Sequence, residues 1–387
     1  MIKKIFIITG EASGDLLGSK LLREFKNSNL AIEFCGVGGQ QMKNYGFESI
    51  FPLEDLAVMG FLEVVPHIPK LLNRINQTVA KIIEFQPDFL ITIDAPDFCF
   101  RVLKKLKKTS QFTKIKKVHL IAPSVWAYRE GRAEKIAKLY DLLLAILPFE
   151  PPYFEKYGLK TVFIGHPLID DAPDLSQKNK INFEFREFYK ISNDDKLILL
   201  TPGSRIGEVK RIFPEFINAV NLLKNKIPNI KIAIPIVKKT HNIVTELSKK
   251  INAEYFLIDD QNHKKYAFYS CDFALAKSGT NAIEISLYKI PLIIAYKINF
   301  LTHFIVKKMI KIKYANLLNL IANREIIPEL LQEKCYANLI FEKILELIEN
   351  KDCAKKQIDE ANISLEILGL NTIKNPMNLA VNEILKL

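Results

Sequence analysis

Two aspartates that follow one short apolar segment are the residues best suited by position to act as a base. The segment, Phe89–Ile93, has the pattern of a buried strand, and Asp94 comes directly after it. A carboxylate in that position is held rigidly, and Pro96 forces an extended or turned backbone before it. Asp94 is therefore a candidate general base for an attacking hydroxyl, with Asp97 orienting the loop. That both aspartates only cap the next helix is an alternative that the local sequence leaves open.

A second group of residues has the chemistry of a phosphate site. Ser278, Gly279 and Thr280 form a turn between an expected strand at 272–276 and an expected helix. Such a turn brings backbone N–H groups, two hydroxyls and the positive end of a helix to one point, which suits phosphate. Glu284 follows about one turn later and can reach a neutral polar group beside the phosphate, such as a pair of ribose hydroxyls. Many glycine turns after strands bind nothing, so the motif needs support from elsewhere.

That support comes from Pro202–Val209, a second turn of the same kind. Gly203 lets the backbone approach an anion, Ser204 adds a hydroxyl, and Arg205 offers a forked donor for phosphate oxygens. Glu208 lies at the start of the following helix, where a carboxylate is favoured as a cap. An ordinary capped helix with a surface arginine remains the alternative.

Three other loops carry polar or aromatic residues after expected strands. Gly10–Asp15 (GEASGD) predicts contacts to an acceptor substrate, or else a tight turn in which Asp15 caps a helix. Trp126, in the loop 123–129, has an aromatic face that stacks on a sugar ring or packs on an acyl chain, although Trp is also a common loop anchor. His166 ends the strand 162–164 and is either a site residue or part of a structural turn.

Metal ligands and cofactor motifs are not expected. The sequence has no H-x-x-x-H pair, no CxxC pair and no Asp-x-Asp, and GEASGD does not match GxGxxG. We therefore predict neither a metal nor a cofactor, and charge on a leaving group would be met by Arg205, helix N-termini and nearby lysines.

The elements that position these residues alternate between strand and helix, which predicts an α/β fold with mainly parallel sheets. The length of 387 residues allows about two domains. We expect a first Rossmann-like domain at 1–170, a polar linker at 171–196, a second Rossmann-like domain at 197–345 and C-terminal helices at 346–387. Two such halves imply a cleft for joining two substrates.

Composition limits the partners and the compartment. The five dispersed cysteines fit a reducing compartment, and no apolar segment approaches the ~18–20 residues of a spanning helix. The first apolar segment is too short for a signal peptide, so we expect a cytoplasmic protein. The formal charge of +12 reflects either a lysine-rich proteome or an anionic partner. Two basic stretches, 101–117 and 297–314, favour an anionic membrane surface, and no nucleic-acid-binding motif is present.

In its longer motifs the sequence resembles the lipid-A-disaccharide synthases, inverting glycosyltransferases of the GT-B fold. The motifs run in order through nearly the whole chain: GEASGD at 10–15, LAVMGFLEV at 56–64, IDAPDF at 93–98, PSVWAYR at 123–129, FIGHP at 163–167, PGSRIGEV at 202–209, SGTNAIE at 278–284 and NLIANREIIPELLQE at 319–333. Two positions depart from the family pattern, Tyr128 where Trp is frequent and Leu318 where Pro is frequent.

The resemblance implies substrates and residue roles. The donor would be UDP-2,3-diacylglucosamine, the acceptor 2,3-diacylglucosamine 1-phosphate (lipid X), and the products UDP and a β-1,6-linked disaccharide 1-phosphate. Asp94 would be the general base, and Arg205 would bind the UDP phosphates or act in catalysis. The residues expected at the substrates are Gly10, Ser13, Asp15, Asp97, Ser124, Trp126, Arg129, His166, Gly203, Ser204, Ser278, Gly279, Thr280, Glu284, Asn319 and Gln332.

The resemblance also implies partners. Peripheral association with the inner membrane agrees with the basic stretches, and an apolar patch for acyl chains would fall near Val58–Leu72. The C-terminal helices permit a homodimer that exchanges them, or a tail that returns to the first domain of its own chain. Another GT-B transferase or an epimerase acting on a UDP-sugar, and a non-catalytic membrane-surface protein, remain the alternative functions.

Overall fold

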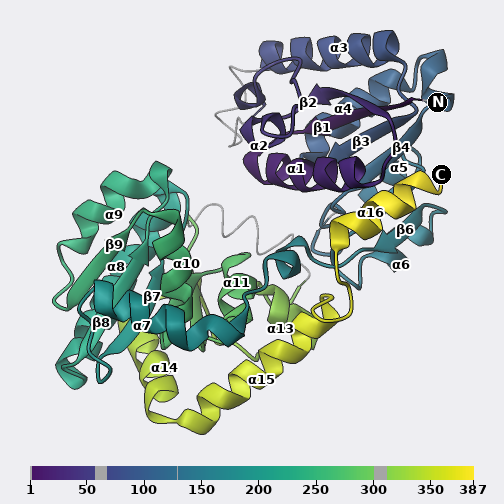
Figure 1. The fold of residues 1–387 in the computed structure, drawn as a ribbon. Coiled ribbons are helices and arrows are strands. Elements are labelled where there is room, and N and C mark those ends of the chain that lie inside the picture. The colour runs from purple at the N-terminus through teal and green to yellow at the C-terminus, as the bar shows by residue number, and fades with distance from the viewer. Residues whose placement is uncertain (1, 57–67, 129, 300–311) are drawn as a thin grey trace. The chain divides into compact units, whose positions relative to one another are not determined.

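The computed structural model describes residues 2–56, 68–128, 130–299 and 312–387, and the chain divides into two compact units (Figure 1). Unit 1 contains residues 1–170 and 368–387, and unit 2 contains residues 171–367. The chain therefore passes between the units twice, after Asp170 and after Ile367.

Unit 1 is built on a parallel sheet whose six described strands have the order β2-β1-β3-β4-β5-β6. Strands β3 and β5 are buried along their whole length, as expected inside a parallel sheet covered on both faces, whereas the edge strands β2 and β6 are only partly buried. Their bounds are β1 Lys3–Thr9, β2 Ile32–Val37, β3 Phe89–Ile93, β4 Lys116–Leu120, β5 Leu142–Ala145 and β6 Lys160–Phe163.

Helices cover both faces of this sheet. Successive side chains of a strand point to opposite faces, so Phe6 and Ile8 of β1 pack in one apolar cluster and Ile5 and Ile7 pack in another. The first cluster is completed by α3, α4, α5 and α6, and the second by α1, α2 and α16 (Figure 1). The helix bounds are α1 Ala12–Asn27, α2 Gln40–Lys43, α3 Ile68–Phe85, α4 Pro96–Leu106, α5 Arg132–Ala137, α6 Pro151–Glu155 and α16 Pro376–Leu385.

Unit 2 repeats this plan with a second parallel sheet, of described order β12-β11-β10-β7-β8-β9. The strands are β7 Lys196–Thr201, β8 Ile230–Pro235, β9 Glu254–Ile258, β10 Phe273–Lys277, β11 Leu292–Tyr296 and β12 Glu329–Leu331. The helices are α7 Lys178–Phe188, α8 Ile206–Lys226, α9 His241–Ser248, α10 Gln261–Ser270, α11 Asn281–Leu287, α13 Leu317–Ala322, α14 Ala337–Glu349 and α15 Lys351–Ile367. The predicted α/β class with two parallel-sheet units is confirmed.

The expected linker at 171–196 is not a separate crossing segment, because it belongs to unit 2 and contains α7. Ile181 and Phe185 are buried one helical turn apart, and α7 packs against α10. Arg186 is buried beside them, where its guanidinium donates to the carbonyl of Ser192 at 2.7 Å and to Asp272 at 3.2 Å. The polar composition of the segment concealed this narrow apolar face.

The C-terminal helices do not form one unit of their own. Helix α15 packs against α11, α13 and α14 of unit 2, whereas α16 belongs to unit 1. Met377 and Ile384 of α16 are fully buried in the cluster beneath the first sheet, and Glu383 pairs with Lys160 at 3.0 Å. The described chain thus has its tail on its own first unit, which is one of the two arrangements that the sequence permits.

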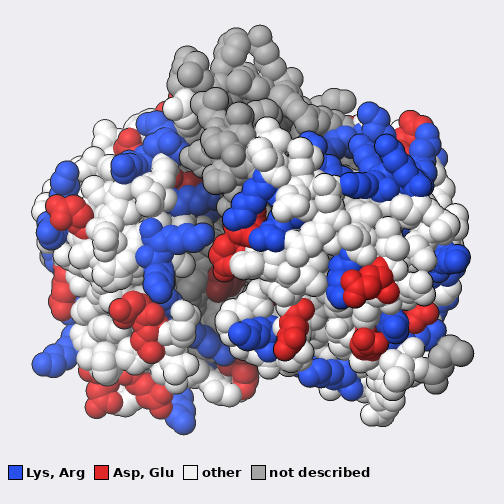
Figure 2. Space-filling model, turned by 90° about the horizontal axis from the view of Figure 1, so that it is seen from above, with Lys and Arg blue, Asp and Glu red and all other residues white. Residues whose placement is uncertain are grey.

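Surface charge is mixed on the face drawn in Figure 2, where positive and negative side chains are interspersed and the positive ones also form a larger group. Of the basic stretch 101–117, every Lys and Arg is exposed except Lys117. Lys117 is buried, donates to the carbonyls of Phe112 and Ile115, and pairs with Asp141 at 2.9 Å. None of the helices that the structure describes has the length and apolar character needed to cross a bilayer.

Candidate functional site

A pocket of about 160 Å³ in unit 1 brings two of the predicted loops together. The loops follow the neighbouring strands β3 and β4, so they leave the same edge of the sheet, where parallel sheets form their ligand sites. Of the predicted site residues, Asp94 and Ser124 line this pocket. The full lining is Asp94, Pro96, Ile121, Ala122, Pro123, Ser124, Val125, Tyr128 and Arg132.

Three residues that line or adjoin this pocket have left-handed backbone conformations, which are unfavourable for side chains other than glycine. They are Asp94 (φ 53°), Ala95 (φ 44°) and Ile121 (φ 75°). The neighbouring strands hold them, because Asp94 N–H donates to Leu120 O and Ile121 N–H donates to Leu144 O, both at 3.0 Å. Each such residue costs of the order of 1–3 kcal/mol, and strain of this kind gathers at active sites.

Gly10 makes the strained turn at Asp94 possible. A Cβ atom at position 10 would lie 2.2 Å from the Cβ of Ala95, far inside contact distance. Gly14 likewise approaches the carbonyl of Ile93, where an added Cβ would lie at 3.3 Å. The first loop, expected to contact the acceptor, thus packs beneath the turn that carries the candidate base. Ser13 in the same loop is exposed.

Asp15, predicted at a substrate, is a cap in this structure. Its buried carboxylate accepts hydrogen bonds from the N–H groups of Gly39 (2.7 Å), Gln41 (2.8 Å) and Met42 (3.2 Å), at the start of α2. With three backbone donors, this carboxylate satisfies the N-terminus of a helix. This is the alternative that the sequence left open, although the capped helix is α2 and not the helix that follows the loop.

Trp126 is a loop anchor. Its indole N–H donates to Glu150 Oε1 at 3.1 Å, and its ring meets Phe149 edge to face at 5.2 Å. Glu150 is almost fully buried and also accepts from Leu147 N–H at 3.1 Å. Burial raises the pKa of Glu150 to about 7, and the hydrogen bonds from Trp126 and Leu147 oppose that rise. The anchored Trp126 fixes the loop whose Ser124 and Tyr128 line the pocket.

Arg132 is a pocket residue that we did not predict. It pairs with Asp97 at 2.9 Å and lies 6.0 Å from the ring centre of Phe100. Asp97, expected at a substrate, is exposed and in this structure holds Arg132 at the rim of the pocket. The basic residue lies in a stretch with no motif of its own, so no local signal indicated it. Arg129 lies outside the described residues.

His166 is a structural residue of unit 1. Its side chain is buried, and its Nδ1 accepts a hydrogen bond from Leu168 N–H at 3.3 Å. Its own N–H donates to Leu368 O at 2.9 Å, which ties the turn to the returning tail. Burial lowers the pKa of His166 to about 4, so the ring is neutral near pH 7. This agrees with the structural alternative, and the substrate contact of His166 stays a prediction.

In unit 2 the two predicted phosphate turns follow adjacent strands. Ala276 of β10 pairs with Thr201 of β7, so the turns after these strands lie at the same edge of the sheet. Gly203 (φ 124°) and Gly279 (φ 146°) both adopt conformations that disfavour other residues. The first turn contains Ser204 and Arg205, and the second contains Ser278 and Thr280.

One buried carboxylate joins these turns. Glu208 is 5% exposed, and its Oε1 lies 3.3 Å from Arg205 Nη1 and 3.6 Å from Lys277 Nζ. Tyr296 also donates its hydroxyl to Oε1 at 3.4 Å. Glu208 was expected only as a cap, and Lys277 was not named among the nearby lysines expected to meet the leaving-group charge. The signal that was available is the position of Lys277, immediately before the glycine turn.

Glu284 follows the second turn on α11 and is exposed. The protein atoms around its carboxyl nevertheless disfavour the charged form and raise its pKa, and the negative charge of Asp171 raises it further. A carboxyl that is partly desolvated and open to solvent on one side suits hydrogen bonding to neutral hydroxyls. The predicted ribose contact is compatible with this environment but is not tested by it.

Asn319 is fully buried and holds the backbone around it. Its Oδ1 accepts from Ile326 N–H and Ile327 N–H, both at 2.9 Å, and its Nδ2 donates to Ile327 O and to Glu329 Oε1, both at 2.7 Å. With these four bonds the side chain has a structural role in this state, and its substrate contact stays a prediction. Gln332 follows β12 in a left-handed conformation (φ 51°).

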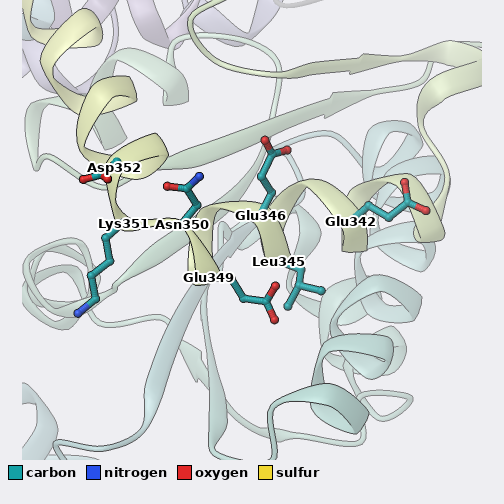
Figure 3. Close-up of a pocket in the computed structure, with 7 residues that line it drawn as sticks. All are labelled: Glu342, Leu345, Glu346, Glu349, Asn350, Lys351 and Asp352. Atoms are coloured by element: carbon teal, nitrogen blue, oxygen red, sulfur yellow. The ribbon is translucent and has the colours of Figure 1, made fainter.

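A separate hollow lies where α14 meets α15, and seven labelled residues line it (Figure 3). Its carboxylates point in different directions instead of converging (Figure 3). A mostly acidic lining repels a phosphate-bearing ligand, so this hollow does not suit a sugar nucleotide. Across the described parts of the chain, no group of three His, Cys, Asp or Glu side chains is arranged to hold a metal ion.

Solved structures share this architecture. A UDP-GlcNAc 2-epimerase from Neisseria meningitidis bound to UDP-GlcNAc matches with a TM-score of 0.63 at 14% identity, covering 100% of both chains. MurG from Acinetobacter baumannii matches with a TM-score of 0.61 at 10% identity, also covering 100% of both chains. At these identities the likeness concerns the fold alone, and the fold is the two-domain GT-B architecture.

Sequence relatives define the family. The lipid-A-disaccharide synthetase family model matches residues 5–382. The lipid-A-disaccharide synthase of Rickettsia bellii is 42% identical over 382 residues, which is 98% of this chain and 97% of the relative. That of Rickettsia akari is 41% identical over 384 residues, 99% of this chain and 95% of the relative. The chain belongs to the lipid-A-disaccharide synthetase family.

Proposed function

We propose that this chain transfers 2,3-diacylglucosamine from UDP to the hydroxyl of 2,3-diacylglucosamine 1-phosphate (lipid X), with inversion at the anomeric carbon. That the chain is a glycosyltransferase that forms the lipid A disaccharide follows from its family. The β-1,6 linkage, the acyl pattern of the substrates and the residue roles below are our proposals.

The observation that carries the proposed chemistry is the strained pocket around Asp94. Its carboxylate follows a rigid buried strand and lines a pocket. In the proposed step the acceptor oxygen forms a bond to the anomeric carbon, the bond from that carbon to the UDP oxygen breaks, and Asp94 takes the hydroxyl proton. Ser124, Tyr128 and Arg132 would orient the acceptor, and Arg132 suits its 1-phosphate.

Unit 2 would hold the donor. The turns at Gly203 and Gly279 supply backbone N–H groups, and Arg205 supplies a cation for the charge that develops on the departing UDP. Glu284 would accept hydrogen bonds from the ribose hydroxyls. Its removal is expected to weaken UDP binding more than it alters turnover of the bound donor.

The decisive experiment supplies both acylated sugars and measures the mass of the product. We expect UDP release only when donor and acceptor are both present, and a product mass equal to the disaccharide 1-phosphate. Interconversion of a UDP-sugar without an acceptor would instead favour an epimerase. Binding to anionic vesicles without binding of UDP would favour a non-catalytic surface protein. A chelator arm tests the prediction that no metal takes part.

We further propose that the chain works in the cytoplasm at the anionic surface of the inner membrane. The exposed lysines and arginine of 101–116 support this, because clustered basic residues are attracted to anionic lipid. Most of the second basic stretch and of the expected apolar patch lies outside the described residues, although Ile68 and Leu72 of α3 are 44% and 49% exposed. Sedimentation with vesicles of anionic or neutral lipid tests the proposal.

A homodimer through the C-terminal helices is the remaining partner proposal. The apolar face of α16 is buried against the first sheet of its own chain. In an exchanged dimer, α16 of each copy would have to bury the same face against the first sheet of the other copy. Light scattering coupled to size exclusion would measure the mass in solution. A monomer at all accessible concentrations would remove the proposal.

A further inference from the structure

We propose that Lys277 binds a phosphate of the sugar nucleotide together with Arg205, and that Glu208 is a positioning residue that holds both cations before the ligand arrives. This inference rests on the proposed function, because it names further residues of the same donor site. The sequence motifs alone give Lys277 and Glu208 no role at the ligand.

The geometry brings both cations to a single oxygen atom. Arg205 Nη1 lies 3.3 Å and Lys277 Nζ 3.6 Å from Oε1 of Glu208. The two cations come from different turns, Arg205 from the start of α8 and Lys277 from the end of β10, and these turns follow paired strands. The carboxylate therefore connects the two turns that are expected to surround the phosphates.

Burial separates the roles of the three side chains. Glu208 is 5% exposed, Lys277 17% and Arg205 62%. A buried carboxylate cannot reach a ligand in solvent, whereas both cations retain a surface toward it. The other carboxylate oxygen of Glu208, Oε2, is buried without a hydrogen-bond partner among the described residues. A Cβ atom added at Gly203 would lie 2.9 Å from this Oε2 atom. Glu208 thus packs beneath the first glycine turn.

Charge also favours a ligand that is an anion. Two cations share this one carboxylate, and the charge of Arg211 acts on the same Tyr296 hydroxyl that donates to Glu208. Like charges held together in a partly desolvated place repel each other, and an added anion relieves that repulsion. A phosphate between the glycine turns would meet the ammonium, the guanidinium and backbone N–H groups at once.

Lys277 is placed to turn from Glu208 to the ligand. Its Nζ is 3.6 Å from the carboxylate, which is an ion pair without a short hydrogen bond. A Cβ at Gly279 would lie 3.2 Å from the same Nζ, so the ammonium lies directly against the second glycine turn. Rotation of the flexible lysine stem, with no movement of the backbone, is enough to bring the ammonium to a phosphate bound there.

The test compares UDP with uridine, which lacks the phosphates, by calorimetry or by competition. We expect Lys277→Met to weaken UDP binding by roughly tenfold to a hundredfold, the usual effect of losing a charge-assisted hydrogen bond, and to leave uridine binding unchanged. Lys277→Arg keeps the charge and should recover most of the loss. The matched control is Lys249→Met, which removes a lysine paired at 2.9 Å with Glu246 on the surface of α9.

The role of Glu208 is tested by a double-mutant cycle. We expect Lys277→Met to cost less UDP affinity in a Glu208→Gln background than in the native chain, because the lysine is no longer held in place. An equal or greater cost in the Glu208→Gln background would refute the role of Glu208. Equal losses for UDP and uridine, or no loss for UDP, would refute the role of Lys277. Failure of the native chain itself to bind UDP would instead refute the donor site in unit 2.

Discussion

The substitution Gly10→Ala tests whether the strained turn at Asp94 is required for catalysis. The new Cβ would lie 2.2 Å from the Cβ of Ala95, whereas carbon atoms in contact are separated by roughly 3.5–4.0 Å. The two loops must therefore separate by roughly 1.5 Å. Overpacking of this kind costs about 1–3 kcal/mol of stability. A displacement of about 1 Å at a catalytic group can lower the rate about a hundredfold, which is the loss we expect in kcat/KM.

A second substitution, Ala95→Gly, should rescue the first. It removes the Cβ that clashes, and the next atom met by a Cβ at position 10 is the Cα of Ala95 at an ordinary 3.7 Å. Glycine also accepts the left-handed conformation of residue 95 (φ 44°, ψ 53°) without strain. The double variant should thus regain most of the activity. Gly131→Ala is the matched control, because a Cβ there would meet nothing within 4 Å.

The assay is the steady-state rate with both acylated sugars, together with UDP affinity. UDP affinity should stay constant throughout, because the proposed donor site is in unit 2. A Gly10→Ala enzyme within about twofold of the native rate would refute the reasoning. So would a double variant no better than Gly10→Ala alone, since the clash with Ala95 would then not be the cause of the loss.

Asp94→Asn should lower kcat by roughly 10²–10⁴-fold and leave UDP affinity unchanged by calorimetry, because it removes the proposed base and keeps the shape. Burial raises the pKa of Glu150 from 4.5 to about 7, so stability contributed by its protonated form is lost as the pH rises from about 4.5 to 7. In the Glu150→Gln variant, the free energy of unfolding measured with urea should depend less on pH between about 4.5 and 7. An unchanged pH dependence would contradict the raised pKa of Glu150. Asn319→Ala should cost about 2–5 kcal/mol of unfolding free energy, since four buried hydrogen bonds are lost. Ile384→Ala should cost about 2–5 kcal/mol by cavity formation, and a negligible loss would show that α16 is dispensable for unit 1.

Most of the strands were predictable from the sequence because they belong to parallel sheets. A strand buried on both faces needs a continuous apolar segment, and such segments at 89–93 and 292–296 coincide with β3 and β11. Helix α7 was not predictable in the same way. It buries a narrow face, Ile181 and Phe185, and leaves Phe183 and Phe188 more than half exposed, so no clear helical period stands out.

The candidate site was predictable only where the chemistry is local. Asp94 could be predicted from a buried strand followed directly by a carboxylate, and in the structure it lines a pocket. Arg132 and Lys277 depend on partners distant in sequence, Asp97 and Glu208, that only the folded chain brings to them. A basic residue in a chain with 55 lysines and arginines has no local mark that distinguishes it from a solvated surface charge.

Matching a motif also cannot separate a residue that touches a ligand from one that supports such a residue. Gly10, Asp15 and Asn319 all lie in family motifs, yet Gly10 leaves space for Ala95, Asp15 caps α2, and Asn319 holds the segment before β12. Both kinds of residue tolerate little change, because a shift in the support displaces the group it supports. Two comparisons separate residues that touch a ligand from residues that support them. The comparison of UDP with uridine removes only the phosphate contacts. The double change at positions 10 and 95 removes only the clash between those residues.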